Sequence, residues 1–277
     1  MDLTMRLEQH RDRLTPADRR VLEVLLSHPT EAAFLRAEEV ADRAGVHQAA
    51  ATRLAQRLGF DGYPGLRAAL QADLLGGIGP GERVRQRLEH AEGADLIQSV
   101  VQDELASLSD LPRHVTQAEL DDVASRIVSA RRAFLFAHGN ATVLVELMHR
   151  RLRRFGVDTV VLGGSGRDIA ESLLGLSAED VVLAFAFLRE PAALAPLLGY
   201  AAERGAGSII VTDTLGALHP APSVLLAAPR GSGREFQSLT VPMAIANALV
   251  LTIARRSADS SLSSLDRLGS LLERFQP

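Results

Sequence analysis

Residues 37–54 have the sequence AEEVADRAGVHQAAATRL, which predicts two short helices separated by a glycine. The first helix ends at Gly45, where glycine permits the left-handed backbone that allows a second helix to cross the first. Val46 can pack into the angle between the two helices. In the second helix, which we expect over 47–58, three apolar residues recur at i, i+3 and i+7 and should face inward: Ala51, Leu54 and Leu58.

The opposite stripe of the second helix is polar, with small residues near its start and arginines toward its end. This pattern suits a helix whose first residues meet base edges in the major groove of DNA while its arginines reach phosphates. We expect DNA contacts from His47, Gln48, Ala49, Thr52, Arg53, Gln56, Arg57 and Tyr63. A three-helix packing unit with a solvated polar face is the alternative interpretation.

Positive charge is concentrated around this helix. The whole chain has a formal net charge of −4, so binding to nucleic acid would need a local basic patch. Between residues 43 and 67, four arginines stand against one acid, Asp61; the arginines are Arg43, Arg53, Arg57 and Arg67. We therefore expect the binding side of the helical region to be basic.

The composition excludes several classes of protein. The chain has 277 residues, enough for two domains of roughly 100–200 residues each. With 47% apolar and 23% charged residues, it fits a globular protein and neither a disordered nor a collagen-like chain. The absence of cysteine excludes disulfides, thiolate metal sites and cysteine nucleophiles. The histidines show no metal-ligand spacing, so we predict no metal site and no cofactor.

We expect a cytoplasmic protein with no membrane partner. The first residues include Asp2 and Glu8 and lack the apolar core of a secretory signal. The longest nearly apolar run, 241–254, is shorter than the roughly 20 residues that a membrane-spanning helix needs.

A glycine-rich break at 76–81, GGIGPG, separates two kinds of sequence. We predict a helical domain over 1–75, a linker and connecting helix over 76–112, a second domain over 113–256 and a helical tail over 257–277. Within the second domain, five apolar runs alternate with helical stretches; the expected strands are 133–137, 159–162, 181–187, 208–212 and 224–227. Such runs are typical of a parallel sheet covered on both faces, which binds ligands beyond the carboxyl ends of its strands.

The segment from Gly45 to Tyr63 resembles a known family. Gly45-Val46, Arg53-Leu54 and the run Leu58-Gly59-Phe60-Asp61-Gly62-Tyr63 are similar to the N-terminal domain of RpiR-type transcriptional regulators. That resemblance implies an all-α helix-turn-helix domain followed by an α/β three-layer domain with a five-stranded parallel sheet, the sugar-isomerase (SIS) fold. The chain departs from the family at His47 and Ala50, where serine and threonine are usual. His47 can still cap the helix, although less well than serine.

The resemblance also implies a ligand site at the strand ends. The family's first loop is represented by His138-Gly139-Asn140-Ala141-Thr142. Gly139 permits a tight turn, Asn140 and Thr142 can donate to an anion, and the helix beginning near Ala141 supplies amides. A plain strand-to-helix turn capped by Asn140 is the alternative.

The family's second loop, Ser-x-Ser-Gly-x-Thr, is replaced here by Phe185-Ala186-Phe187-Leu188-Arg189-Glu190-Pro191. Three interpretations remain open. Arg189 can form a bidentate ion pair with an acidic ligand, or it can face solvent. The pocket can also have become apolar and hold a different effector or none. We favour a changed class of ligand instead of a standard phosphosugar.

Four further residues near strand ends are candidate ligand contacts: Ser165, Phe187, Thr212 and Glu235. The loop 163–166 is rich in glycine but lacks the lysine and spacing of a nucleotide-binding P-loop. Thr212 could equally belong to a turn or a cap. Glu235 lies near the position of a proton-transfer base in SIS isomerases, but a base without a cradled substrate does little, so we predict no catalytic residue.

The pattern as a whole predicts a regulator that binds a double-stranded DNA operator and a small-molecule effector as a homodimer or tetramer, since one recognition helix covers only a half-site. The helices at 83–111 and 237–256 are the expected contacts between subunits. A sugar-phosphate isomerase remains an alternative. A ligand-free dimeric scaffold is another, which Phe185 and Phe187 filling the pocket would favour.

Overall fold

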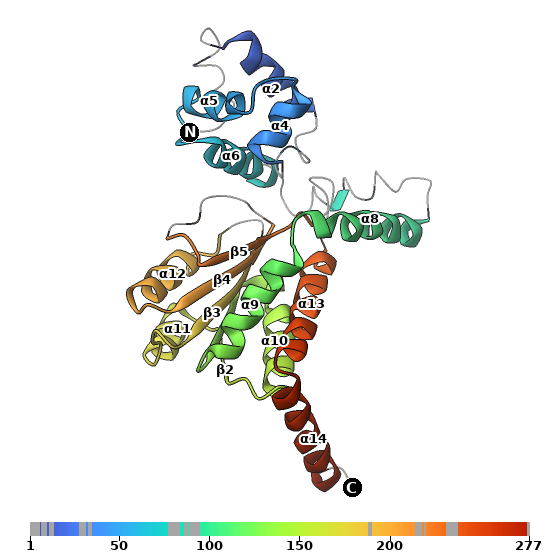
Figure 1. The fold of residues 1–277 in the computed structure, drawn as a ribbon, viewed down its shortest axis with the longest axis vertical. Coiled ribbons are helices and arrows are strands. Elements are labelled where there is room, and N and C mark those ends of the chain that lie inside the picture. The colour runs from blue at the N-terminus through green and yellow to red at the C-terminus, as the bar shows by residue number, and fades with distance from the viewer. Residues whose placement is uncertain are drawn as a thin grey trace. The chain divides into compact units, whose positions relative to one another are not determined.

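The computed structural model describes residues 14–27, 35–76, 95–187, 190–213, 220–230 and 238–275, with single positions at 6, 10, 32, 84, 85, 88 and 218. The chain divides into two compact units (Figure 1). The first comprises 1–107, 213–217 and 229–238, and the second comprises 108–212, 218–228 and 239–277. The units divide inside a helix, between Ser107 and Leu108, and the predicted domain limits at 75 and 112 remain predictions.

The first unit is helical, as predicted. Its described helices are α2 (Pro16–Ser27), α4 (Ala37–Arg43), α5 (Ala49–Arg57), α6 (Tyr63–Gly76) and most of α8 (Leu96–Asp110). Helices α2, α4, α5 and α6 share one apolar core. Proline suits the start of α2 because the first helical residue has no intrahelical partner for its N–H.

The turn between α4 and α5 has the predicted glycine geometry. Gly45 has φ +61°, and the N–H of Val46 donates to the carbonyl of Ala41 at 2.9 Å. Val46 packs against the apolar core. The three residues predicted to face inward from α5 are fully buried: Ala51, Leu54 and Leu58. The sequence-based helix-turn-helix prediction is therefore confirmed.

The Leu58-Gly59-Phe60 run closes α5. Gly59 has φ +78°, and the N–H of Phe60 donates to the carbonyl of Ala55 at 3.0 Å, the bonding pattern of a glycine-terminated helix. Arg6 adds a cation there, because its Nη1 donates to the carbonyls of Leu58 and Gly59 at 3.1 and 2.6 Å. A positive group at a helix C-terminus also stabilises the helix through its dipole.

The second unit contains a five-stranded parallel sheet in the order β2-β1-β3-β4-β5. The strands are β1 (Ala133–Ala137), β2 (Thr159–Leu162), β3 (Val181–Ala186), β4 (Gly207–Thr212) and β5 (Val224–Ala227). Each agrees with its predicted range to within one residue. The predicted parallel sheet is confirmed.

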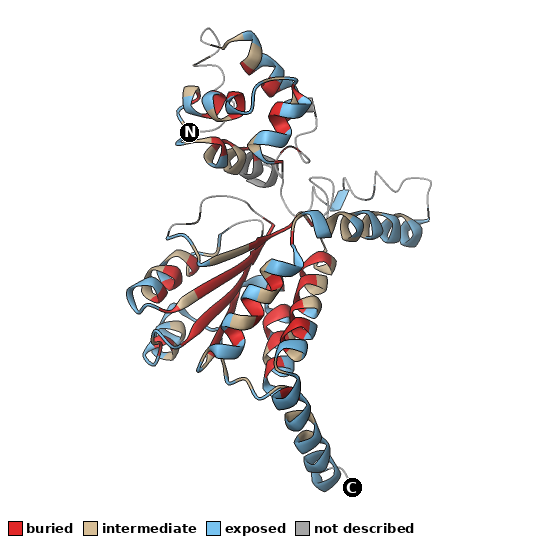
Figure 2. Cartoon of the chain, viewed as in Figure 1, coloured by how far each residue is buried: buried red, intermediate tan, exposed pale blue. Residues whose placement is uncertain are grey.

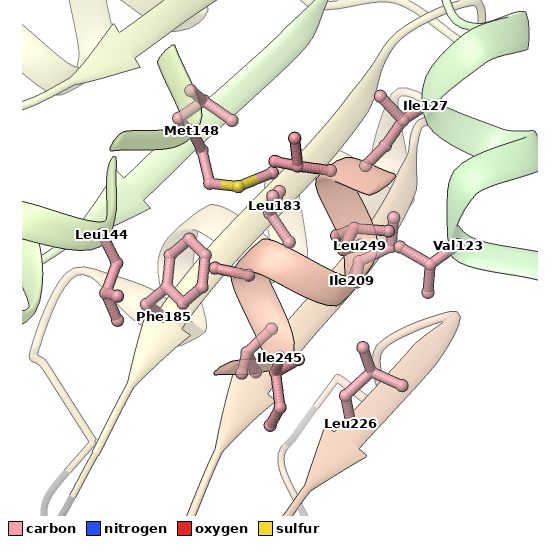
Figure 3. Packing of buried hydrophobic residues seen from close by; sticks show 14 of the residues in the cluster. Val123, Ile127, Leu144, Met148, Leu183, Phe185, Ile209, Leu226, Ile245 and Leu249 are labelled. Atoms are coloured by element: carbon pink, nitrogen blue, oxygen red, sulfur yellow. The ribbon is translucent and has the colours of Figure 1, made fainter. Parts of the chain in front are cut away.

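Helices cover both faces of this sheet, which makes three layers (Figure 1). One face packs against α9 (Gln117–Ser129), α10 (Thr142–Arg154) and α13 (Thr240–Arg256), and the other against α11 (Gly166–Leu173) and α12 (Leu194–Glu203). Side chains alternate between the faces, so Leu183 and Phe185 of β3 join the α10–α13 core (Figure 3), whereas Val182 and Ala184 join the other. Two short 3-10 turns, η2 (Leu111–Arg113) and η3 (Gly139–Ala141), and the helix α14 (Ala258–Phe275) complete the unit.

The connections create a switch point between neighbouring strands β1 and β3. The helix after β1 is α10 and the helix after β3 is α12, and they lie on opposite faces of the sheet. Open parallel sheets bind ligands in the crevice at such a point, beyond the carboxyl ends of the strands. Among the described residues, no helix is both long and apolar enough to cross a bilayer.

Candidate functional sites

The polar stripe of α5 is open to solvent. Ala49, Arg53 and Gln56 are exposed, and Thr52 is partly exposed (Figure 2). The other side of the same helix lies in the core, with Ala50, Ala51, Leu54 and Ala55 buried. The crossing second helix thus presents four of the predicted contact residues on its outer face.

The N-cap of α5 is Gln48, which makes no side-chain cap hydrogen bond. His47 precedes it, and its Nδ1 accepts a hydrogen bond from the N–H of Ala49 at 3.2 Å. His47 and Gln48 are both exposed at the start of α5.

Arg57 has a structural partner. Its Nη1 forms an ion pair with Oδ2 of Asp18 and lies 3.3 Å from Oγ1 of Thr15. The Asp18 side chain is only 2% exposed and also accepts from the backbone N–H of Thr15 at 2.7 Å. Arg57 therefore holds α5 against the start of α2 while its side chain stays 35% exposed, and its role as a DNA contact stays a prediction.

Tyr63 needs correction as a DNA contact. The side chain is 3% exposed and belongs to the apolar core, and its hydroxyl has no hydrogen-bond partner within the described part of the chain. Burial raises its pKa to about 12. The tyrosine of the Gly62-Tyr63 pair therefore anchors the start of α6 in the core and offers little surface to a partner.

The basic patch is smaller than the sequence predicted. Arg67 is half-buried, its Nη1 donates to the carbonyl of Leu35 at 3.4 Å, and burial lowers its pKa. Arg57 is also only partly exposed, so Arg43 and Arg53 are the exposed arginines of the four counted around α5. Of these two, Arg53 lies on the stripe.

A pocket of about 710 Å³ lies in the second unit, next to the switch point. Its wall comes from the ends of β1 and β2, the first turns of α10 and α11, and the segment before α12. The lining residues are Phe136, Ala137, His138, Thr142, Val143, Val145, Glu146, Val161, Leu162, Gly163, Gly164, Gly166, Ile169, Pro191, Ala192 and Ala193. Most of these side chains are apolar.

The predicted turn after β1 borders this pocket. Gly139 has φ +62°, Ala141 is buried and Asn140 is exposed between them. Thr142 lines the pocket, and its hydroxyl donates to the carbonyl of Gly139 at 2.8 Å. Thr142 is thus the residue of the predicted set whose side chain reaches the pocket.

Ser165 acts as a helix cap. It precedes α11, its N–H and hydroxyl both lie 2.7 Å from Oδ2 of Asp168, and the N–H of Asp168 donates back to its hydroxyl at 3.4 Å. Hydrogen bonds from Ser165 lower the pKa of Asp168. The N-terminus of α11 therefore already holds a carboxylate of the chain itself, and the neighbouring glycines line the pocket instead of Ser165.

Phe187 and Thr212 are not among the residues that line this pocket, and their role as ligand contacts stays a prediction. Phe187 packs against the α10–α13 core, and Phe185 is buried in that core (Figure 3). Neither phenylalanine lines this pocket: the pleat of β3 turns Phe185 to that core, and Phe187, directly after β3, packs against the same core. Thr212 is buried, and its carbonyl accepts from the N–H of Ala228 at 3.0 Å. Arg189 and Glu235 lie outside the described residues.

Glu146 is one of several pocket residues that the sequence interpretation missed. Residues 142, 143 and 146 recur at helix spacing on the first turns of α10, a signal that could have identified them. The Glu146 carboxylate lies 2.6 Å from Nε of Arg150, and this hydrogen bond lowers its pKa. Besides His138, it is the ionisable side chain in the described lining.

Comparison with known proteins fits this arrangement. Residues 1–75 match the family described as a helix-turn-helix domain of the rpiR family. A bifunctional protein glk from Burkholderia thailandensis is 27% identical over 232 residues, which cover 84% of this chain and 36% of that protein. The chain therefore spans about a third of the length of the curated relatives that it first matches.

Two solved structures share the fold. The Vibrio vulnificus NanR protein complexed with ManNAc-6P has a TM-score of 0.60 at 19% identity and covers 99% of both chains. The sugar isomerase domain of an RpiR transcription factor from Sphaerobacter thermophilus has a TM-score of 0.58 at 21% identity, over 63% of this chain and 98% of that one.

Fold and sites together define a class of protein: a helix-turn-helix domain followed by an α/β domain of the sugar-isomerase type with a pocket at its strand ends. The match of residues 1–75 to the rpiR family of helix-turn-helix domains confirms the resemblance to RpiR-type regulators, and the two solved structures share the fold.

Proposed function

We propose that this chain is a DNA-binding transcriptional regulator whose second domain binds a small molecule. The exposed stripe on α5 is the observation that supports DNA binding most directly. Its contacts with DNA are His47, Gln48, Ala49, Thr52, Arg53 and Gln56. Small Ala49 lets the helix approach base edges, and Arg53 reaches a phosphate or a guanine.

The regulator acts as a dimer, because one such helix covers a half-site and a two-fold protein matches a two-fold operator. Helix α8 supports this part of the proposal. Within the described chain all of its residues keep part of their surface open, and its exposed apolar residues are Leu96, Ile97, Val100, Val101 and Leu105. An apolar face of this kind is typical of a contact between subunits. We assign the protein to the cytoplasm, where such a regulator meets DNA.

The pocket beside β1 and β2 is the effector site. The NanR structure holds a phosphosugar, ManNAc-6P. In this chain the pocket wall is mainly apolar, the carboxylate of Glu146 lines it, and Asp168 occupies the N-terminus of α11. These carboxylates oppose a phosphate, so we propose an effector that is largely apolar and carries no phosphate.

Effector binding shifts the dimer between conformations that differ in where its two α5 helices lie. A ligand shifts an equilibrium between conformations only by its difference in affinity for them. The pocket lies where three loops and two helix N-termini meet, so a ligand there can favour one arrangement of these segments.

Selection of bound DNA from random fragments with the full chain tests the proposal. We expect an enriched two-fold sequence for the wild type, and about 1–3 kcal/mol weaker binding for Arg53→Ala, roughly 5- to 150-fold in Kd. Arg126→Ala is the matched control. It removes the same charge, and Arg126 is exposed on α9 in the second unit.

Two results would contradict the proposal. Failure to enrich any sequence over random DNA would remove the regulator function. Equal affinity of wild type, Arg53→Ala and Arg126→Ala on both selected and random DNA would remove the α5 stripe from the DNA-binding surface.

A further inference from the structure

Helix α14 has an apolar face that its own domain covers only in part. Its first half packs against α10 and α13, and a Cβ added at Gly156 would lie 2.9 Å from Oγ of Ser264. Ser261 is its buried residue. Figures 1 and 2 show the rest of the helix leading away from α13 with much of its surface exposed. Four large apolar residues are open to solvent, with exposed fractions of 59% for Leu262, 42% for Leu271, 45% for Leu272 and 80% for Phe275.

The sequence of α14 repeats after seven residues. Residues 265–268 are LDRL and residues 272–275 are LERF, so each repeat has an apolar residue, an acid, an arginine and an apolar residue. Apolar positions spaced by three and four residues form the seam of a coiled coil. The charged residues and the serines at 263 and 270 fall away from this seam.

We propose that α14 pairs in an antiparallel orientation with α14 of a second copy of this chain. If the helices cross between Leu268 and Gly269, residues whose numbers add to the same sum lie opposite each other. Leu262 then meets Phe275, and Leu265 meets Leu272. This places the most exposed apolar side chains of one helix against those of the other.

Packing and charge both support this occupant. Gly269 has no atom within 4 Å of the position of a Cβ, so the helices can approach closely at the crossing. The orientation is antiparallel because the first half of each helix is held by its own domain, and a parallel pair would bring both domains to the same end. Helix α14 holds three acids and two arginines, a net charge of −1: Asp259, Asp266, Glu273, Arg267 and Arg274. An acidic lipid surface or a nucleic acid would need a basic face, which this helix does not have.

This surface goes beyond the proposed function and does not depend on DNA binding. Helix α14 is a different segment from α8, and its pairing adds a second contact between copies. Two self-association surfaces on one chain permit assemblies larger than a dimer.

Single cysteines provide a sharp test, because the chain has none and every disulfide must then join two copies. We expect Leu268→Cys in the full chain to form an inter-chain disulfide on mild oxidation, since crossing helices bring this position within disulfide distance of its copy. Ser270→Cys, on the opposite face, is the matched control and should stay unlinked.

Orientation is tested with the helix ends. Leu262→Cys and Phe275→Cys chains mixed together should cross-link to each other, whereas Phe275→Cys alone should not. No linkage of Leu268→Cys, or linkage equal to that of Ser270→Cys, overturns the pairing. Linkage of Phe275→Cys alone overturns the antiparallel orientation.

Sedimentation provides a second measurement in case cysteine at 268 disturbs folding. Leu272→Ser combined with Phe275→Ser changes only exposed side chains of the outer turns, so the domain should keep its melting temperature. We expect the double variant to sediment as a smaller oligomer than the wild type, because the α14 contact between copies is lost. An unchanged mass with the same melting temperature overturns the proposal.

Discussion

Arg53 and Arg57 lie on the same helix, one turn apart, and have different surroundings. Arg53 is exposed on the outer stripe, whereas Arg57 is 35% exposed and paired with an aspartate that is almost wholly buried. Breaking a buried ion pair leaves an uncompensated charge, which is strongly destabilising. Replacing the two arginines should therefore lower the free energy of unfolding by different amounts.

We expect Arg57→Ala to lower the free energy of unfolding by about 1–3 kcal/mol, less than for a fully buried pair because Arg57 is partly solvated. Arg53→Ala is the matched control and should change it by less than about 0.5 kcal/mol. Urea unfolding followed by circular dichroism measures both. Equal stability of the two variants would mean that the ion pair with Asp18 contributes nothing to the fold.

Asp180, directly before β3, is a second buried carboxylate with a defined role. Burial acts to raise its pKa, but hydrogen bonds from Arg131 at 2.6 Å and from Ser177 at 2.8 and 3.0 Å outweigh burial and lower the pKa to about 2. An unfolded aspartate titrates near ~3.9. The stabilisation is therefore present above about pH 4 and is lost as the pH falls toward 2.

We predict that Asp180→Asn lowers stability at neutral pH and flattens the loss of stability between about pH 4 and 2. Asp158→Asn is the control, because Asp158 is exposed near the same end of the sheet. Unfolding curves at several pH values measure the effect. The same slope for wild type and Asp180→Asn in this range would contradict the assignment.

At the scale of single elements, one backbone conformation fixes the crossing of α4 and α5. Gly45 has φ +61° and open space around the position of a Cβ, so any cost of a side chain there comes from the backbone alone. Gly199, inside α12, also has open space but an ordinary helical backbone. Adding the same methyl group at the two positions should thus have opposite effects.

We predict that Gly45→Ala destabilises the protein by about 1–2 kcal/mol through left-handed strain. Gly199→Ala should stabilise it by about 0.5–1 kcal/mol, because alanine is the better helix former. Thermal unfolding of both variants measures the difference. A Gly45→Ala variant as stable as the wild type would show that the turn can relax to an ordinary conformation.

At the scale of the whole molecule, the pocket connects ligand chemistry to stability. A ligand at 100 times its Kd stabilises the folded state by about 2.7 kcal/mol, which raises the melting temperature by several degrees. We expect a thermal-shift screen of the full chain to find stabilising compounds among apolar metabolites without phosphate. Strong stabilisation by phosphosugars would contradict the proposed class of ligand.

A pocket variant makes this screen specific. Val143 lines the pocket and is about half exposed, so Val143→Gln should reduce the shift with little effect on the fold. Val128→Gln on α9 is the matched control, because Val128 is also exposed but lies outside the described lining. An equal shift in both variants would place the ligand elsewhere.

Local patterns in the sequence were enough to predict the elements of this fold. The apolar runs of the five strands and the spacing of Ala51, Leu54 and Leu58 depend on periodicity, which each segment carries by itself. Gly45 likewise specifies its turn through its own backbone. These predictions held because the physical cause and the residue lie within the same short segment.

Tertiary structure decided which polar residues remain available. Arg57 and Tyr63 lie in the family-like segment, but Arg57 pairs with an aspartate 39 residues away in sequence, and the shared core buries Tyr63. The pleat of β3 turned Phe185 away from the pocket, and helix spacing brought Glu146 into it. Burial and pairing depend on residues distant in sequence, so periodicity alone could not predict them.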